Sequence, residues 1–329
     1  WALHALPALL NQRPRAIPTY HSAGLYWQTT PGGPEVPCTV RYRPAEGEHA
    51  WRKAMDLWFD ARNGEYRGSI LNLAPGTTYD VELTLGRADQ PARLRVSTWP
   101  DRPPVARTVR LKPGTRREPL VISEGGSPDG YVLYTVAPDT SLTIDVANKH
   151  DHCVQVAASY VIVRGLTLKG ARRDGVLLRG VHDVVIERCD ISGWGRPDPT
   201  GLTPFGADMD AGIKGTSPAL SRITVQRNRI HHPRCDSNSW MQLGNPDTGS
   251  YHPRGPQAIV WGNNDGNHVI RYNEVYSDDE HRFNDCIGGY SNFSRQGFPG
   301  PDSDVYGNRV QDCWDDGLEI EGGGRNVRV

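Results

Sequence analysis

The sequence has no excess of charge of either sign, since 37 lysines and arginines stand against 38 aspartates and glutamates in 329 residues. Without a basic field, nucleic acid and anionic membrane surfaces are poor partners, and we expect neither. No apolar run approaches the ~20 residues of a membrane span. The most apolar segment, 2–10, lacks a basic start and contains a proline. We therefore expect no membrane span, and the composition indicates no particular oligomeric state.

The six cysteines show no CxxC or metal-finger spacing. They are Cys38, Cys153, Cys189, Cys235, Cys286 and Cys313. Isolated cysteines are usually small buried apolar groups, and we expect that role here, without a prediction of disulfide pairing. The sequence also lacks an initiator Met and a visible signal peptide. We expect that the chain begins after processing or trimming, and that the protein is secreted, periplasmic or on the cell surface.

Phenylalanine is scarce, with 5 residues, whereas Gly 36 and Pro 26 are frequent, which favours a strand-rich and turn-rich architecture. The length is sufficient for two domains with cores. Segments such as SAGLYWQ, CTVRYRP and YDVELTL place apolar side chains at every second position. Leu25 and Trp27 share one face, as do Val40 and Tyr42. This period of two, broken by Gly, Pro and Asn, predicts a β-sandwich over residues 18–100, after an N-terminal extension at 1–17.

The sharpest local motif is LNLAPGTTYDVEL, in which Pro75 and Gly76 precede Tyr79. It resembles the tyrosine corner of fibronectin type III domains, where the tyrosine hydroxyl bonds to nearby backbone. The resemblance implies a fibronectin type III-like sandwich of about 80 residues. Pro100, Pro103 and Pro104 then form a stiff linker. No catalytic cluster lies inside the sandwich, so we expect a structural role for it.

The remaining sequence contains a weak repeat in five segments: VIVRGLTL, VVIERCDI, ITVQRNRI, HVIRYNEV and DVYGNRV. One position aligns as Leu166, Cys189, Asn228, Asn273 and Asn308. Three residues before it stand Val163, Ile186, Val225, Ile270 and Val305. Two residues after it stand Leu168, Ile191, Ile230, Val275 and Val310.

A further strand follows each segment, with aligned inward residues Val176, Ile213, Ile259, Ile287 and Leu318. Stacked aliphatic columns predict a right-handed parallel β-helix, with Asn228, Asn273 and Asn308 as a ladder of amides. A sandwich or a propeller is the alternative, but neither hairpin chemistry nor a blade motif separates these runs. Residues 105–329 thus resemble the pectate-lyase-like superfamily of parallel β-helix proteins. That fold hosts lyases, hydrolases, epimerases and non-catalytic rods.

The last residues, Val327 and Val329, fall where a next coil would begin. An uncovered coil exposes a sheet edge. The sequence therefore indicates a β-helix truncated at the C-terminus, and we expect further coils or a cap in the natural protein.

Carboxylates recur at the turn before the third strand in several of the predicted coils. One column reads Asp174, Ala211, Gln257, Asp285 and Asp316, and the column before it ends in Asn284 and Asp315. Asp285 and Asp316 are expected on adjacent coils, roughly 5 Å apart. Asp285, Asp315, Asp316 and Glu319 are thus a candidate metal set, and oxygen ligands suit Ca²⁺. Since close carboxylates repel, they need a cation, a shared proton or a basic partner, for which His281 and Arg282 are nearest in sequence.

Three interpretations of this acidic group remain open. In a lyase, Ca²⁺ neutralises a uronate, and Lys214, His231, His232 or Arg282 serves as the base. In a hydrolase, Asp285 and Asp316 share the acid and base roles. NDCI and WDDG are similar to the paired aspartates of polygalacturonases, but their order is swapped and no GHG or RIK follows. The third interpretation is that Asp-Gly is ordinary turn chemistry.

Two insertions, 193–210 and 231–256, leave the predicted coils at the same turn and can wall the acidic group. They supply aromatic and basic side chains that can bind a sugar, and with later residues they give the candidate substrate-binding set Trp194, Trp240, His252, Arg282 and Tyr290. Neighbouring His231 and His232 are expected to point in opposite directions on a strand, which disfavours a transition-metal site.

These features predict a secreted, carbohydrate-active β-helix protein whose partner is a polysaccharide. The leading hypothesis is a polysaccharide lyase acting on a uronate-containing glycan, with Ca²⁺ as a possible cofactor. The alternatives are a glycoside hydrolase on the same fold, with paired aspartates, and a non-catalytic glycan-binding or surface-display rod.

Overall fold

The computed structural model describes residues 13–30, 32–88, 90–216, 219–291 and 293–329. It is all-β over these residues, without a helix, and accordingly no helix in them is long and apolar enough to cross a membrane. The chain divides into two compact units, Trp1–Pro103 and Pro104–Val329, at the proline-rich segment. Most of the expected N-terminal extension, residues 1–12, lies outside the described residues. Each unit has its own apolar core.

The first unit contains two antiparallel four-stranded sheets, ordered β1-β2-β6-β5 and β4-β3-β7-β8. Their strands are β1 (Arg15–Pro18), β2 (Ala23–Trp27), β3 (Cys38–Pro44), β4 (Arg52–Lys53), β5 (Trp58–Asp60), β6 (Glu65–Ile70), β7 (Thr78–Leu85) and β8 (Ala92–Ser97). The residues expected on one face, including Leu25, Val40 and Val81, are buried in the shared core. The first strand begins at Arg15, within the segment assigned to an extension.

The hydroxyl of Tyr79 lies at the turn that precedes its strand. It accepts a hydrogen bond of 2.8 Å from the backbone N–H of Ala74. Tyr79 is buried, so this bond satisfies a polar group that would otherwise be costly to bury. The contact expected between the Tyr79 hydroxyl and nearby backbone is therefore present.

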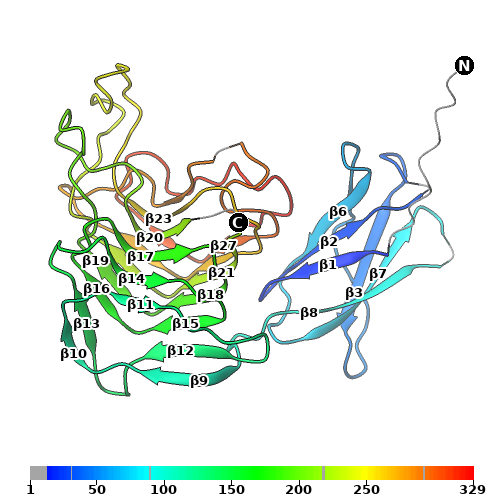
Figure 1. Cartoon of the computed structure of the whole chain (residues 1–329). Coiled ribbons are helices and arrows are strands. Elements are labelled where there is room, and N and C mark those ends of the chain that lie inside the picture. The colour runs from blue at the N-terminus through cyan, green and yellow to red at the C-terminus, as the bar shows by residue number, and fades with distance from the viewer. Residues whose placement is uncertain (1–12, 31, 89, 217–218, 292) are drawn as a thin grey trace, which may run out of the picture. The chain divides into compact units, whose positions relative to one another are not determined.

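The second unit is built from three parallel sheets through which the chain passes in rotation (Figure 1). The first sheet contains β9 (Val105–Arg110), β12 (Tyr131–Thr135), β15 (Val161–Arg164), β18 (His182–Glu187), β21 (Ser221–Gln226), β24 (Val269–Arg271) and β27 (Asp304–Tyr306). The second contains β10 (Gly114–Arg116), β13 (Leu142–Asp145), β16 (Thr167–Lys169), β19 (Asp190–Ser192), β22 (Arg229–His231), β25 (Glu274–Tyr276) and β28 (Arg309–Val310). The third contains β11 (Leu120–Ile122), β14 (His152–Val156), β17 (Asp174–Arg179), β20 (Ala211–Thr216), β23 (Gln257–Trp261) and β26 (Ile287–Gly288).

This arrangement is compatible with a parallel β-helix, and its register agrees with the repeat in the sequence. In the first sheet, Val163, Ile186, Val225, Ile270 and Val305 pair in succession. The predicted columns of the second and third sheets pair in the same way, the last step being an isolated bridge between Ile287 and Leu318. The aliphatic columns form the core of this unit.

The expected asparagine ladder is present at the turn between the first and second strands of each coil. Asn228 donates from Nδ2 to Oδ1 of Asn273 at 3.0 Å, and Asn273 donates to Oδ1 of Asn308 at 2.9 Å. Each acceptor oxygen also takes the backbone N–H of the asparagine in the preceding coil. The ladder continues one coil further, because Oδ1 of Asn228 accepts the backbone N–H of Cys189.

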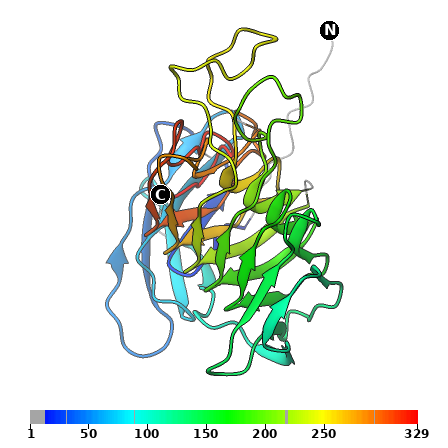
Figure 2. The same cartoon turned by 90° about the vertical axis from the view of Figure 1, so that its left-hand side faces the viewer.

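Both long insertions leave the coils between the second and third sheets. Residues 193–210 join β19 to β20, and residues 232–256 join β22 to β23. Figures 1 and 2 show the second insertion, in yellow, projecting from the end of this unit where the later coils lie. The expectation that both insertions use the same turn is therefore correct.

The cysteines depart from their expected role in one pair. Cys286 and Cys313 form a disulfide across a sequence separation of 27 residues. Cys38, Cys153 and Cys189 are free and buried, as expected, and Cys235 is free and partly exposed. The disulfide joins Cys286, which follows Asp285, to Cys313, which stands two residues before Asp315, and so links two adjacent coils.

Candidate functional site

The acidic column at the turn before the third sheet is held by a repeated hydrogen bond. Oδ1 of Asp174 accepts the backbone N–H of Ala211 at 3.0 Å, and Oδ1 of Asp285 accepts the backbone N–H of Asp316 at 3.2 Å. The side chain at this position in one coil thus caps the chain of the next coil. This contact places Asp285 and Asp316 on adjacent coils, as the repeat predicts.

Asp285 is a buried carboxyl in a negatively charged environment. Its Oδ2 accepts a hydrogen bond of 3.1 Å from Nε2 of Gln257, and only 3% of the residue is exposed. Burial is the main cause that raises the pKa of Asp285 to about 8, and the charge of Glu319 raises it further. The bond from Asp316 N–H opposes the shift. Asp285 therefore holds a proton at neutral pH.

Asp315 contacts the second insertion through both carboxylate oxygens. Its Oδ1 accepts a hydrogen bond of 3.1 Å from Nε1 of Trp240, and its Oδ2 lies 3.5 Å from Nε2 of His252. Burial raises the pKa of Asp315, and the positive charge of His252 opposes this shift. The rings of Trp240 and His252 are 4.8 Å apart. Asp315 thereby positions this insertion beside the acidic column, although both side chains remain more than half exposed.

Three other carboxylates, from Asp316, Glu319 and Glu321, form the group that can hold a cation. One oxygen from each lies within 4.8 Å of the others. Oxygen-only donors at this spacing suit Ca²⁺. Two residues of the predicted metal set, Asp316 and Glu319, belong to this group, and Glu321 stands with them in place of Asp285 and Asp315. Alternation explains the change, since Glu319 and Glu321 are two residues apart and share a face, whereas Asp285 and Asp315 bond to neighbouring protein groups.

An open cavity of about 620 Å³ lies over this part of the third sheet. Its acidic wall includes Asp285 and Glu319, and Tyr290 stands at its edge. Glu319 fits against the chain because Gly288 has no side chain, and its Oε2 lies 3.4 Å from the backbone N of Gly289. The opposite wall consists of insertion residues, among them Asp208, Asn245, Ser250, His252 and Arg254. The cavity is large enough for sugar units.

Lys214 occupies its predicted column but makes no contact with the acidic group. Lys214, Val260 and Gly288 pair in succession along the third sheet, and Glu319 follows in the next coil. Lys214 and Glu319 are thus three coils apart, which corresponds to roughly 14 Å. Nζ of Lys214 donates to the carbonyl of Met209 at 2.6 Å. A role for Lys214 as base therefore requires a substrate that extends along the sheet.

His231 ends β22 on the second sheet, His232 follows it, and neither is among the residues that line the cavity. Contrary to expectation, their rings meet, with the two Nδ1 atoms 2.8 Å apart. The reason is that His232 has a φ of +47°, which breaks the alternation of the strand. Nε2 of His231 lies 3.1 Å from Asp190, and burial lowers the pKa of His231 while Asp190 opposes the shift. The structure therefore does not bring either histidine to the cavity beside the acidic group.

Two candidate substrate-binding residues are engaged elsewhere. Trp194 is fully buried and stacks on Phe283, with ring centroids 6.1 Å apart. It is therefore a core residue that cannot stack on a sugar, because the chain at Gly193 and Gly195 adopts positive φ and turns inward between them. Arg282 forms a bidentate ion pair with Asp236, which raises the pKa of Arg282.

The basic partner of the acidic residues is consequently His252, and neither Arg282 nor His281 serves in that role. His281 bonds to Asp278 instead. Of the predicted binding set, Trp240, His252 and Tyr290 are exposed beside the cavity or its wall, and Trp194 and Arg282 are not available.

Sequence reasoning missed a group of buried oxygens near the cavity. Oδ1 of Asp208, Oε1 of Gln257 and Oδ1 of Asn284 are buried and have no hydrogen-bond partner among the described residues. Burial raises the pKa of Asp208, against the effect of Arg254. The aligned columns of the sequence place Gln257 and Asn284 beside Asp285, and this alignment could have identified both residues as part of the site. Asp208 lies in an insertion without a repeat, so the sequence pattern could not locate it.

Comparisons with known proteins give no family. No protein-family model matches the sequence, and the search of curated proteins finds no match. Among solved structures, the chain is similar to the sensor domain of the anti-sigma factor RsgI4 from Pseudobacteroides cellulosolvens. The identity is 17%, the match covers 27% of this chain and 94% of that chain, and the TM-score is 0.22.

Proposed function

We propose that the second unit is a right-handed parallel β-helix of the pectate-lyase-like type and that it cleaves a uronate-containing glycan. The rotation of the chain through three parallel sheets and the asparagine ladder support this fold. We propose equally that the first unit is fibronectin type III-like. The order of its two sheets and the bond between Tyr79 and Ala74 support that assignment.

The observation that best supports this activity is a protonated carboxyl group beside further carboxylates in an open cavity. With a pKa of about 8, Asp285 retains a proton at pH 7. Glu319 lines the same cavity, and its charge contributes to that shift. Pairs of carboxyl groups in different protonation states catalyse glycoside hydrolysis, one as acid and the other as base or nucleophile. We assign the acid to Asp285 and the second role to Glu319.

In this mechanism, Asp285 donates its proton to the glycosidic oxygen as the bond to the anomeric carbon breaks. The carboxylate of Glu319 removes a proton from water or attacks the anomeric carbon directly, and the distance between the two groups in the bound complex decides which. Arg254 and His252 on the opposite wall supply positive charge for the carboxylates of a uronate. Tyr290 provides an exposed ring on which a sugar face can stack.

A second candidate is calcium-assisted β-elimination on the same substrate. The carboxylates of Asp316, Glu319 and Glu321 favour it, because a bound Ca²⁺ would neutralise a uronate at this position. Lys214 lies three coils away on the same face of the sheet, so it can bind the carboxylate of another unit of the chain, and the base would have to come from a residue nearer the cation. The disulfide between Cys286 and Cys313 supports a location outside the cytoplasm for either enzyme, since such bonds persist in oxidising compartments.

The test is incubation of the full chain with a panel of acidic polysaccharides, with and without Ca²⁺. Hydrolysis releases reducing ends without absorbance from an unsaturated product, whereas elimination produces both. Glu319→Gln should abolish cleavage, and Glu274→Gln, which changes an exposed glutamate on β25, should leave it unchanged. If no glycan in the panel yields either product, the enzyme proposal fails. Binding without turnover would instead support a non-catalytic rod.

A further inference from the structure

One face of the first unit carries an ordered array of arginines that the proposed cleavage does not use. Arg41, Glu82 and Arg93 pair across β3, β7 and β8, and form one row. Arg43, Asp80 and Arg95 form a second row two residues along the same strands. Side chains two residues apart on a strand share a face, so all six project from the same side of the sheet.

The two carboxylates hold the arginines in place. Glu82 accepts Nε of Arg93 at 2.9 Å and also pairs with Arg41, and Asp80 accepts Nε of Arg95 at 2.7 Å. Because these pairs use Nε, the outer ends of the guanidinium groups remain accessible, and the four arginine side chains are between 40% and 73% exposed. Four arginines against two carboxylates leave an excess of two positive charges.

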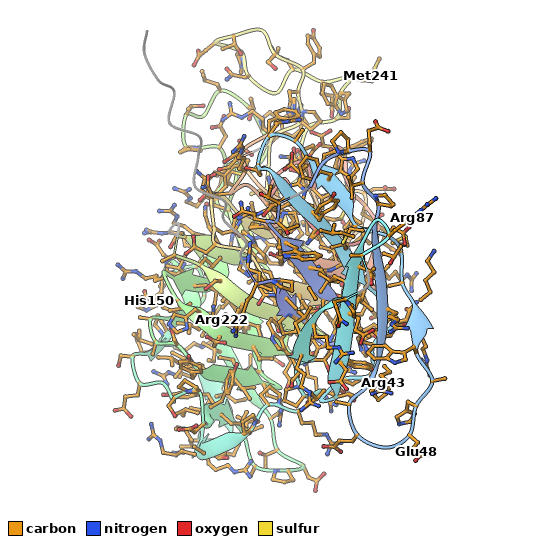
Figure 3. All side chains as sticks on the ribbon, turned by 90° about the vertical axis from the view of Figure 1, so that its right-hand side faces the viewer. Arg43, Glu48, Arg87, His150, Arg222 and Met241 are labelled. Carbon is orange, nitrogen blue, oxygen red and sulfur yellow. A yellow bond between two sulfur atoms is a disulfide. The ribbon has the colours of Figure 1, made fainter. Side chains whose placement is uncertain are left out.

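Trp51 adds a flat apolar surface at the edge of the array. The guanidinium groups of Arg41 and Arg43 lie 4.9 Å and 4.5 Å from its ring centroid. Trp51 and the arginines line a shallow cavity of about 580 Å³. Arg43 is labelled on this unit in Figure 3, as is Arg87 at the turn after β7.

We propose that this arginine face is a second binding site, for a polyuronate chain. Rows lie about 7 Å apart and the arginines of a row about 10 Å apart, as strand geometry dictates. The face thus offers guanidinium groups at regular intervals to a polymer with regularly spaced carboxylates, and guanidinium pairs with carboxylate in a two-pronged geometry. Trp51 stacks on a sugar face beside them. The choice of a uronate as the ligand rests partly on the proposed function. The geometry by which the arginines would bind an anion is independent of that function.

The experiment measures binding of the full chain to polygalacturonate by affinity electrophoresis, with fully methyl-esterified pectin and a sulfated glycan as parallel arms. The double variant Arg93→Gln/Arg95→Gln should weaken binding about tenfold, as expected for the loss of two charge-assisted contacts. The control Arg87→Gln/Arg102→Gln removes two exposed charges elsewhere in the unit and should bind like wild type. Trp51→Leu, with an intact melting curve, should also weaken binding.

The outcomes separate this site from the proposed activity. Cleavage of short oligouronides should be unchanged in the double variant, because the second unit alone carries that cavity. Equal binding of wild type and double variant would overturn the inference and leave the array as a stabilising ladder of ion pairs. Equal binding of the esterified polymer, or binding to the sulfated glycan alone, would overturn the assignment to uronate.

Discussion

The buried carboxyl of Asp285 should make the stability of the second unit depend on pH in a direction opposite to that of most carboxylates. Its pKa is about 8 in the folded protein, against the ordinary aspartate value of 3.8 that applies to the unfolded chain. Between these values the folded state binds a proton that the unfolded state does not. The contribution of Asp285 to the free energy of unfolding is therefore largest below about pH 4. It falls as the pH rises and stays constant above about pH 8.

The linked free energy is of the order of 6 kcal/mol across that window, at 1.36 kcal/mol for each pH unit. The groups facing Asp285 are Glu319, Asp315 and Asp316, whose charges raise its pKa, and Gln257, which donates to its Oδ2. Asp285→Asn removes the titration and keeps the shape. The amide of Gln257 can reverse to present Oε1, which has no partner among the described residues.

The assay is urea unfolding of the full chain from pH 5 to pH 9, followed by tryptophan fluorescence, with the transition of each unit fitted separately. The wild type should lose stability as pH rises, whereas Asp285→Asn should show a flatter profile and be the more stable protein at pH 9. Glu274→Gln is the control and should follow the wild type. Parallel profiles for the wild type and Asp285→Asn would refute the reasoning.

Three further predictions concern the supports of this site. Asn273→Ala breaks two rungs of the ladder and leaves the backbone N–H of Asn228 unpaired. Urea unfolding should show that the free energy of unfolding falls by roughly 2–4 kcal/mol. The control Asn263→Ala, at an exposed position, should leave it almost unchanged. Saturating Ca²⁺ should raise the melting temperature, by a stabilisation of about 2.7 kcal/mol at one hundred times Kd. Asp316→Ala should abolish this increase, so an identical calcium response in both proteins would contradict a site at Asp316, Glu319 and Glu321. Cys313→Ser should lower the free energy of unfolding by roughly 3.5 kcal/mol, because the disulfide closes a separation of 27 residues. Cys235→Ser is the control, since Cys235 is a free cysteine. A comparable loss in Cys235→Ser would contradict the disulfide as the cause.

The columns of the second unit were predictable because each residue depends only on its neighbours in adjacent coils. Ile213 pairs with Val176 and Ile259, and the spacing of aliphatic residues in the sequence already carries that information. The asparagine ladder follows from the same register. The same register predicts the part of the candidate site that lies on the repeat. Asp285, Asp316 and Glu319 belong to that part.

The rest of the site depends on contacts that no repeat encodes. Arg282 pairs with Asp236, which is 46 residues earlier and lies in an insertion. Trp194 turns inward between two glycines of positive φ, and His232 turns toward His231 because of its own positive φ; alternation along a strand anticipates neither. The array on the first unit could not be predicted from single strands, because each of its rows joins residues from three strands, and their pairing is not encoded in the sequence of any one of them.

The asparagine ladder and the insertions occupy different corners of each coil. Successive ladder positions, Asn228, Asn273 and Asn308, are separated by 45 and 35 residues, yet every rung has the same contacts. The difference in length is absorbed at other turns, including the one that borders the cavity. Mutations that lengthen or rebuild that turn therefore leave the ladder and the aliphatic columns undisturbed. The fold can thus accept loops of new length and sequence at this turn at little cost to its own stability.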